Sequence, residues 1–456
     1  MSNTLFHVAV VGTGASGTLV AAQFKRLAPQ GRLVIIGNEP RPARGVAYST
    51  TFQSNLLNVP AGNMSAFPHD MSHFTNWLIH RRPHANASSF AKRELYGEYL
   101  AEIFDSVISD KTNTQYIRES VTDLSKEDDI WTIQLSNGDS IQAQTVVLAF
   151  GNFLPPNDPI DFGAIESNYY RNPWLSDSIK NLDADAPVLL LGTGLTSIDV
   201  ALSLRELGHR GIIHAISRRG RLYLTHKYHA SFPLLSVPED FKSPLGALRW
   251  IRSKVENLKS DELDWRSVID SLRPHTATIW QSWSIAQKKS FLRHARNLWD
   301  IHRHRIAPKI AEQLNALLDE KTLQIHSGHL ISATPNGLNA NIRWQDANGE
   351  IQTLTVTRVI NCTGPSRDYS KIQSPLIRNL RKKGFIVPDE LRLGFETDSQ
   401  GRFVDSKGES VQGLFTLGPT RIPALWESIA IPEIREQALN VAELIISETI
   451  EAFIPA

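Results

Sequence analysis

Cysteine is almost absent from this sequence: Cys362 is the single one among 456 residues. One thiol excludes a disulfide within the chain, a structural zinc site and a CxxC redox centre. An enzyme that works through a pair of redox-active cysteines is therefore not expected.

Long apolar runs and an excess of one charge are also missing. No run approaches the roughly 18 apolar residues that a membrane-spanning helix needs, so no membrane span is expected. The 48 basic and 47 acidic residues give a net charge of +1, which argues against a general attraction to nucleic acid or anionic membranes. Met1 to His7 lacks the basic region of a signal peptide, and we expect a cytoplasmic protein.

Two segments of the chain repeat one arrangement, over residues 7–36 and 188–217. Each has a short apolar run, a glycine-rich turn, a helical stretch and a second apolar run, which is the pattern of a βαβ unit in a parallel sheet. With 41% hydrophobic and 21% charged residues, the composition suits a globular enzyme. The expected fold class is α/β with two Rossmann-type dinucleotide-binding domains.

The first glycine turn follows the apolar run 7–11 directly and opens a predicted helix over 15–27. This is the context that the GxGxxG dinucleotide fingerprint requires. Its first glycine permits a tight turn, the second lets a pyrophosphate approach the backbone, and the third lets the helix pack on the strand. The alternative is a purely structural turn. The predicted cofactor contacts here are Gly12, Gly14, Ala15, Ser16 and Gly17.

An acidic residue near the end of the second apolar run would accept hydrogen bonds from ribose hydroxyls. The expected position is near Gly37, which is not acidic, so Asn38 or Glu39 is predicted to serve instead. The alternative for Glu39 is a solvated loop carboxylate.

The second glycine turn differs at the ribose position. Ser197, still a small residue, replaces its third glycine, and arginines follow the next apolar run where an NAD site has an acid. Because arginine pairs with phosphate through charge-assisted contacts, this pattern favours NADPH over NADH. The alternative is that both arginines are ordinary surface charges. The predicted contacts are Gly192, Gly194, Leu195, Thr196, Ser217, Arg218 and Arg219.

Three other candidate features receive structural interpretations. Asp199 lies in the first turns of the helix after the second glycine turn, where a carboxylate is favourable with the helix dipole. His302 and His304 are two residues apart and do not share a helix face, so no metal site is predicted. The five tryptophans between residues 250 and 299 are expected to pack as core rather than as an aromatic cage. No catalytic acid or base is evident.

As a set, nine segments resemble the bacterial FAD-NAD(P)-binding protein family, which is distantly related to the N-hydroxylating and Baeyer–Villiger flavin monooxygenases. The resemblance covers nearly the whole chain. Tyr169 to Trp174 lacks the histidine of the Baeyer–Villiger fingerprint. The segments are Gly12–Gly17, Gly45–Tyr48, Leu57–Ala61, Leu95–Leu100, Gly192–Thr196, Ser217–Gly220, Arg303–Pro308, Asn361–Pro365 and Trp426–Ser428.

The resemblance implies a glutathione reductase-like arrangement in which an FAD domain (residues 1–180 and 356–456) is interrupted by an NAD(P)H domain (187–355). A helical insertion at 239–318 is expected to cover the active site and shape the substrate pocket. A helix start near Pro432 would aim N–H groups at the flavin pyrimidine; the alternative is a plain packing helix. Further predicted cofactor contacts are Asn58, Met64, Gly151, Gly364, Gly418, Pro419 and Trp426.

The expected function is that of an FAD-dependent, NADPH-using oxidoreductase. We expect a flavin monooxygenase that oxygenates a small nucleophilic substrate, an amine among the candidates, with dioxygen through a C4a-(hydro)peroxyflavin. One alternative is an NADPH-dependent flavin reductase that passes electrons to a partner protein or quinone. Another is a non-enzymatic redox sensor that binds FAD.

Overall fold

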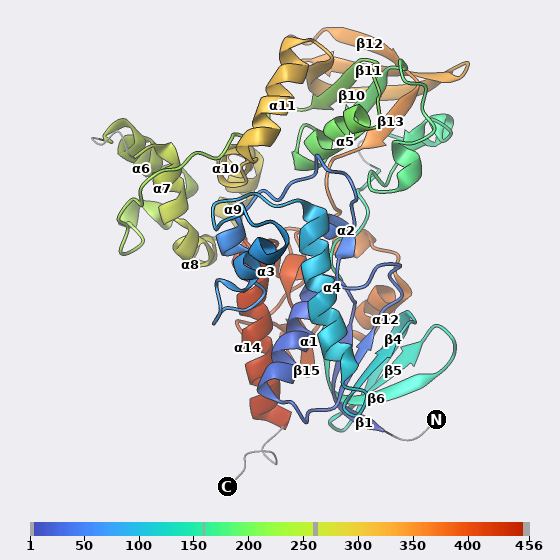
Figure 1. Cartoon of the computed structure of the whole chain (residues 1–456), viewed down its shortest axis with the longest axis vertical. Coiled ribbons are helices and arrows are strands. Elements are labelled where there is room, and N and C mark those ends of the chain that lie inside the picture. The colour runs from blue at the N-terminus through green and yellow to red at the C-terminus, as the bar shows by residue number, and fades with distance from the viewer. Residues whose placement is uncertain (1–3, 158–159, 259–262, 450–456) are drawn as a thin grey trace.

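The computed structural model describes residues 4–157, 160–258 and 263–449. Two β-sheets lie one above the other along the long axis of the molecule, and a group of helices projects to one side (Figure 1). The lower sheet lies near both ends of the chain.

The lower sheet is parallel at its centre, with strand order β14-β15-β6-β1-β2-β3 and the hairpin β4–β5 attached to β6. Buried β1 residues alternate between its faces: Val8 and Val10 pack with α1, α4 and α14, whereas Ala9 and Val11 pack with β4, β5 and α12. The strands are β1 (Leu5–Val11), β2 (Leu33–Ile36), β3 (Thr114–Ile117), β4 (Val121–Glu127), β5 (Ile130–Leu135), β6 (Ser140–Leu148), β14 (Arg402–Val404) and β15 (Ser410–Thr416).

The helices of this lower unit include three long ones on the same face of the sheet, and α1 and α14 run side by side there (Figure 1). Their bounds are α1 (Ala15–Leu27), α2 (Gly45–Tyr48), α3 (His73–Arg81), α4 (Arg93–Ser109), α12 (Pro375–Lys383), α13 (Ile422–Leu425) and α14 (Ile431–Thr449).

The upper sheet has the order β12-β11-β10-β9-β8-β13-β7. Strands β7, β13, β8, β9 and the start of β10 are parallel, and β10 to β12 form an antiparallel meander. Helices α5 (Leu195–Glu206) and α11 (Pro308–Asp319) pack on one face. The strands are β7 (Tyr169–Tyr170), β8 (Val188–Leu191), β9 (Ile213–Ser217), β10 (Leu323–Asn336), β11 (Asn339–Asp346), β12 (Ile351–Val356) and β13 (Arg358–Asn361).

Between β9 and β10 the chain forms the projecting helices. Local signals fix where they start: Ser243 caps α6, with Pro244 at its first position, and Asp264 and Ser284 form capping boxes at α7 and α9. None of the helices in the described residues is long and apolar enough to cross a membrane. The projecting helices are α6 (Pro244–Glu256), α7 (Trp265–Ser271), α8 (Thr276–Ser282), α9 (Ile285–His294) and α10 (Arg296–Arg303).

The expected α/β fold with two Rossmann-type units is confirmed. Each unit begins with a strand–turn–helix–strand segment whose strands pair in parallel, β1 with β2 and β8 with β9. The carboxyl ends of both pairs carry the glycine turns, which is where ligands bind in open α/β sheets.

Candidate cofactor and substrate sites

The first glycine turn is so tightly packed that side chains are excluded at two positions. Gly12 has φ +108°, and a Cβ there would lie 2.4 Å from the Ala149 carbonyl oxygen. A Cβ on Gly17 would lie 2.0 Å from the Gly12 carbonyl oxygen. Only glycine at both positions lets strand β1, helix α1 and the residue after β6 approach one another this closely.

The middle glycine of this turn faces open space instead. A Cβ on Gly14 would approach a single atom within 4 Å, the Cα of Gly45, at 3.7 Å. Gly14 is the N-cap of α1, and the helix start has no side-chain cap and no acidic residue in its first turn. The first N–H groups of α1 therefore keep their hydrogen-bonding capacity and a positive partial charge for an anion such as a diphosphate.

The second turn repeats this geometry in the upper sheet. Gly192 has φ +107°, and its Cβ would lie 2.7 Å from the Cys362 carbonyl oxygen. Gly194 would meet only a ring carbon of Tyr223, at 3.9 Å, and α5 likewise lacks a side-chain cap and a first-turn acid. Leu195 and Thr196, which open α5, are partly exposed, as Ala15 is at the start of α1.

Two glycines beyond neighbouring strands complete the correspondence. Gly151 follows β6 with φ +65°, and Gly364 follows β13 with φ +88°. For both, an added Cβ would meet no atom of the described residues within 4 Å. Each glycine turn thus has a second, open stretch of backbone beside it.

The strands after the two turns end at equivalent points but carry opposite charges. The Gly12 N–H donates to the Ile36 carbonyl at 2.8 Å, and the Gly192 N–H donates to the Ile216 carbonyl at 2.7 Å. Glu39 lies three residues after Ile36 and Arg219 lies three residues after Ile216, so the two side chains stand at matching positions. A carboxylate suits a ribose diol, whereas a guanidinium suits a ribose phosphate.

Glu39 is already held at its turn. Its carboxylate accepts hydrogen bonds from the N–H and the hydroxyl of Thr13, inside the first glycine turn. Asn38, the other candidate, is exposed, and its amide donates to the Ser120 hydroxyl at 2.9 Å. Glu39 is therefore the better placed of the two beside the turn.

At the second turn, Ser217 lies directly beside the glycine turn. Its hydroxyl lies 2.9 Å from the Thr193 hydroxyl and accepts from the Gly220 N–H at 3.0 Å. Arg218 and Arg219 are exposed. The Arg219 guanidinium donates to the carbonyls of residues 293 and 294 at 3.2 and 3.4 Å, which holds it over the end of α9.

A cavity of about 640 Å³ lies where the lower unit meets the projecting helices. Its walls come from the loop Asn58–Asn63, the segment His226–His229, the ends of α7 and α10, and the chain from Glu427 to Glu433. We call it the junction cavity. The His226 Nε2–H donates to the Asn58 carbonyl at 2.9 Å and ties two of these walls together.

Ion pairs dominate the junction cavity. Arg303 binds Glu427 and Arg273 binds Glu433, each at 2.7 Å. Arg305 binds both oxygens of Asp270, at 2.5 and 2.6 Å. Three guanidinium groups thus face three carboxylates, so the charges of these pairs balance.

Two carboxylate oxygens of this network are left without partners. Oε1 of Glu427 and Oε2 of Glu433 are buried and accept no hydrogen bond within the described structure. The Glu427 side chain is only 8% exposed. An unpaired buried acceptor is costly. Both oxygens are closed off from the cavity in this structure, so it is the negative charge of the two carboxylates, which line the cavity, that favours a cationic ligand.

Burial and these charges shift the pKa values around the cavity. Burial, with help from Arg305, lowers the pKa of His226 to about 4, so its imidazole is neutral near neutral pH. Burial lowers the pKa of Arg303, but the Glu427 and Glu433 carboxylates outweigh it and hold that pKa above its usual value. The Arg303 guanidinium therefore stays charged.

Three predicted flavin contacts lie elsewhere. Met64 is 2% exposed and packs in the hydrophobic core under α1 and α4, so its side chain has almost no surface for a ligand. Pro419 is buried as well. Trp426 faces a different cavity, where it stacks on Trp280 with ring centroids 4.8 Å apart. Distant packing, which local motifs do not encode, buries or redirects these side chains, and the three cofactor contacts stay predictions.

Two other predicted positions take up structural places beside the sites. Gly418 is buried, and a Cβ on it would lie 3.1 Å from the Ser16 hydroxyl at the start of α1. Asp199 pairs with Arg93 of α4 at 2.8 Å rather than only with its own helix dipole. Burial raises the pKa of Asp199 to about 6, although Arg93 acts to lower it. This ion pair joins the upper and lower units.

Of the residues that line the junction cavity, Asn58 was predicted from the sequence as a flavin contact, whereas its charged residues were not singled out. The lining comes from several segments far apart in the chain, and no single segment contains a recognisable motif of charges. A signal was present, since Arg303–Pro308 and Trp426–Ser428 belong to the set of segments that carries the family resemblance, and both contribute to the cavity walls or lie beside them.

Comparisons with known proteins agree with this geometry. Residues 9–153 match the family model described as FAD-NAD(P)-binding. A flavin-containing monooxygenase of Arabidopsis thaliana, FMO GS-OX-like 2, is 23% identical over 241 residues, which cover 46% of this chain and 49% of the plant protein. The chain thus spans about half the length of that relative.

Solved structures match over nearly the whole chain. The L-lysine 6-monooxygenase of Pseudomonas syringae superposes with a TM-score of 0.68 at 15% identity, covering 98% of this chain and 100% of that one. The ornithine N-hydroxylase of Kutzneria sp. 744, solved with reduced FAD, NADP+ and L-ornithine, gives 0.67 at 13% identity with the same coverage. The chain therefore matches the FAD-NAD(P)-binding family model over residues 9–153, and as a whole it has the two-domain fold seen in these N-hydroxylating monooxygenase structures.

Proposed function

We propose that this chain is an FAD-dependent, NADPH-using monooxygenase that oxygenates a small nucleophilic substrate, an amine in the preferred form. One observation carries the proposal: Glu39 and Arg219 stand at matching positions beside two equivalent glycine turns, which would suit the first turn to a ribose diol and the second to a ribose phosphate. Bound FAD would supply the chemistry, accepting a hydride from NADPH and activating dioxygen.

The lower turn is the proposed FAD site. The Glu39 carboxylate would accept hydrogen bonds from the adenosine ribose, and its charge would repel a 2′-phosphate. The free N–H groups at the start of α1 would bind the diphosphate, which the open space at Gly14 admits. We propose residues 1–180 and 356–456 as this domain.

The upper turn is the proposed NADPH site, in a domain of residues 187–355. The start of α5 would bind its diphosphate, and Arg219, with Arg218 beside it, would bind the 2′-phosphate through charge-assisted hydrogen bonds. The carbonyls of residues 293 and 294 already hold the Arg219 guanidinium in place, which lowers the entropy lost when a phosphate binds.

The junction cavity is the proposed reaction chamber. Helix α14 begins at Ile431, directly after the cavity residues 428–430, so its positive end would face the flavin ring and stabilise negative charge there. The carboxylates of Glu427 and Glu433, which line the cavity, would attract a substrate ammonium. The Glu427 carboxylate would accept the proton that the amine loses on becoming a nucleophile.

The helical insertion contributes to this chamber through its inner ends. Asp270 on α7, Arg273 and Arg303 line the junction cavity, and the Arg273–Glu433 pair connects the insertion to α14. These contacts support the interpretation that residues 239–318 shape the substrate pocket.

Rapid mixing tests the proposal and separates it from its alternatives. The purified protein should be yellow, should bleach faster with NADPH than with NADH, and should show a transient near-ultraviolet band when the reduced protein meets oxygen. Immediate reoxidation without that band, together with electron transfer to a quinone, would favour a reductase. Absence of bleaching by NADPH would leave a sensor, and a colourless protein that takes up no FAD would overturn the cofactor assignment.

The substrate assignment has its own test. Glu427→Gln should leave bleaching by NADPH intact but reduce amine-dependent product and increase hydrogen peroxide release, because the amine loses its acceptor. Glu436→Gln on α14, whose side chain is 55% exposed, is the matched control and should behave as the unmodified protein. Equal product yields from both variants would contradict the assignment.

A further inference from the structure

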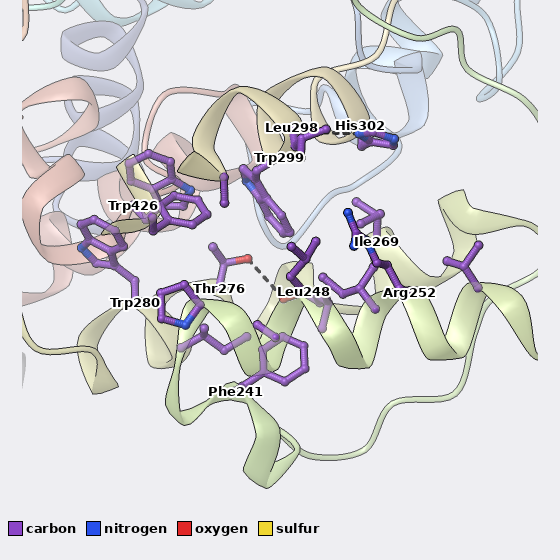
Figure 2. Close-up of a pocket in the computed structure, with 18 of the residues that line it drawn as sticks. Phe241, Leu248, Arg252, Ile269, Thr276, Trp280, Leu298, Trp299, His302 and Trp426 are labelled. Carbon is purple, nitrogen blue, oxygen red and sulfur yellow. Dashed lines mark hydrogen bonds between the residues drawn. The ribbon is translucent and has the colours of Figure 1, made fainter. Parts of the chain in front are cut away.

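A second cavity, of about 470 Å³, lies inside the projecting helices. It shares no lining residue with the junction cavity and contains none of the glycine turns. Helices α6 to α10 form its walls, and two phenylalanines and five tryptophans line it (Figure 2). The tryptophans are Trp265, Trp280, Trp283, Trp299 and Trp426. We call it the tryptophan cavity.

The sequence-based expectation of a packed tryptophan core is therefore only partly correct. Trp280 and Trp283 are buried, but the rings surround a space instead of filling it. The cavity is partly open to solvent, so its apolar walls are in contact with water when no ligand is bound, and covering them with an apolar ligand is favourable. Its volume and apolar lining fall within the range of small-molecule sites, about 300–1,000 Å³.

Hydrogen bonds within the wall hold the cavity open. The indole N–H of Trp280 donates to the Pro423 carbonyl and that of Trp283 to the Phe241 carbonyl, each at 2.7 Å. These bonds fix both rings against neighbouring backbone, while the Trp280–Trp426 stack closes one end of the cavity. Collapse of the rings into the space would break these contacts.

The lining also defines the chemistry of an occupant. Its ionisable side chains are Arg252, Glu256 and His302; the first two are exposed and opposite in charge, so they favour no net charge. Figure 2 shows Arg252 and His302 away from the end closed by Trp280 and Trp426. The indole N–H of Trp299 is buried and has no hydrogen-bond partner within the described structure, so it does not face the cavity, and the Trp299 ring offers its apolar surface to an occupant.

We propose that the tryptophan cavity is a binding site for a neutral, largely apolar small molecule. The aromatic rings bury its apolar body, and the absence of a net charge in the lining disfavours a charged one. Trp426 closes this cavity, and the next residue, Glu427, lines the junction cavity, so an occupant contacts the segment that borders the proposed reaction chamber. The site does not depend on the proposed function.

Titration calorimetry of the full chain with 2-acetonaphthone, a neutral aromatic ketone, tests this site. Saturable binding at one site is expected, with weaker binding of the charged 2-naphthoate. Ala247→Phe fills the cavity from α6, where Ala247 is 7% exposed, and should weaken binding at least about tenfold. Leu245→Phe, on the same helix at an exposed position outside the lining, should leave affinity within about twofold.

A second cavity-filling variant keeps the test decisive. Ala295→Phe fills the cavity from the other wall and replaces Ala247→Phe if that variant does not fold. Absence of saturable binding, or equal affinity in the folded cavity-filling variants and Leu245→Phe, would overturn the proposal whatever the flavin chemistry proves to be.

Discussion

Replacing Arg219 by alanine should abolish most of the preference for NADPH over NADH. Arg219 stands three residues beyond the carbonyl that anchors the second glycine turn, where Glu39 stands at the first. Its guanidinium would bind the 2′-phosphate, which NADH lacks. The substitution should therefore weaken NADPH binding and leave NADH binding nearly unchanged.

The structure sets the size of this effect. A hydrogen bond to a charged group contributes about 1.5–3 kcal/mol, which corresponds to roughly 10- to 150-fold in affinity. Arg219 is exposed, so solvent screening places the loss near the lower end, at roughly tenfold. Arg219→Glu should go further, because its carboxylate would also repel the phosphate.

The assay is anaerobic reduction of the flavin at a series of NADPH and NADH concentrations, which yields a dissociation constant for each. Steady-state KM values would mix binding with later steps. Arg26→Ala removes one exposed positive charge from the end of α1 in the lower unit and is the control. An unchanged NADPH-to-NADH ratio in Arg219→Ala would refute the equivalence of the two turns.

Two other predictions concern stability. Gly14→Ala should keep the unfolding free energy within about 1 kcal/mol of the original, because the new Cβ enters open space. It should prevent FAD binding, because the Cβ would occupy the space proposed for the diphosphate. Gly12→Ala should lower the unfolding free energy by at least about 2 kcal/mol, because its Cβ would clash with the Ala149 carbonyl. The pKa of His226 is about 4 in the native protein, against 6.5 in the unfolded chain. The unfolding free energy should therefore fall by up to about 3 kcal/mol as the pH drops from 6.5 to 4. His226→Gln should remove this dependence, while its amide still donates to the Asn58 carbonyl.

Urea unfolding at several pH values and flavin titration of the apoprotein measure these effects. The sign for His226 follows from linkage: below pH 6.5 the unfolded chain binds a proton that the native imidazole does not take up until about pH 4. His80→Gln, at an exposed position on α3, is the control. The same pH slope in the unmodified protein and in His226→Gln would contradict the assignment, as would normal FAD binding by Gly14→Ala.

Much of the fold was predictable because its signals are local. The runs ending at Val11 and Leu191 are apolar, each is followed at once by a glycine turn, and each turn opens a helix. Strand, turn and helix are contiguous, so backbone preference and burial pattern suffice to identify them. The opposite charges of Glu39 and Arg219 were also predictable from the local sequence, because each residue lies just after an apolar run.

The substrate-side features were not predictable, because they depend on segments that meet only after folding. Arg303 and Glu427 are 124 residues apart in sequence but form one ion pair, and Asn58 meets His226 across 168 residues. Met64 and Trp426 lie in conspicuous motifs, but core packing buries the first and the stack on Trp280 turns the second towards another cavity.

The sequence by itself determined two glycine turns at the ends of buried parallel strands, each free of a side-chain cap, and the opposite charges beside them. Glycine conformation, helix-end chemistry and apolar patterning act over a few neighbouring residues, so they need no knowledge of the rest of the chain. Only the tertiary structure decided that Asp270, Arg303 and Glu427 share one cavity and that five tryptophans surround another, because the packing of distant helices sets which side chains meet.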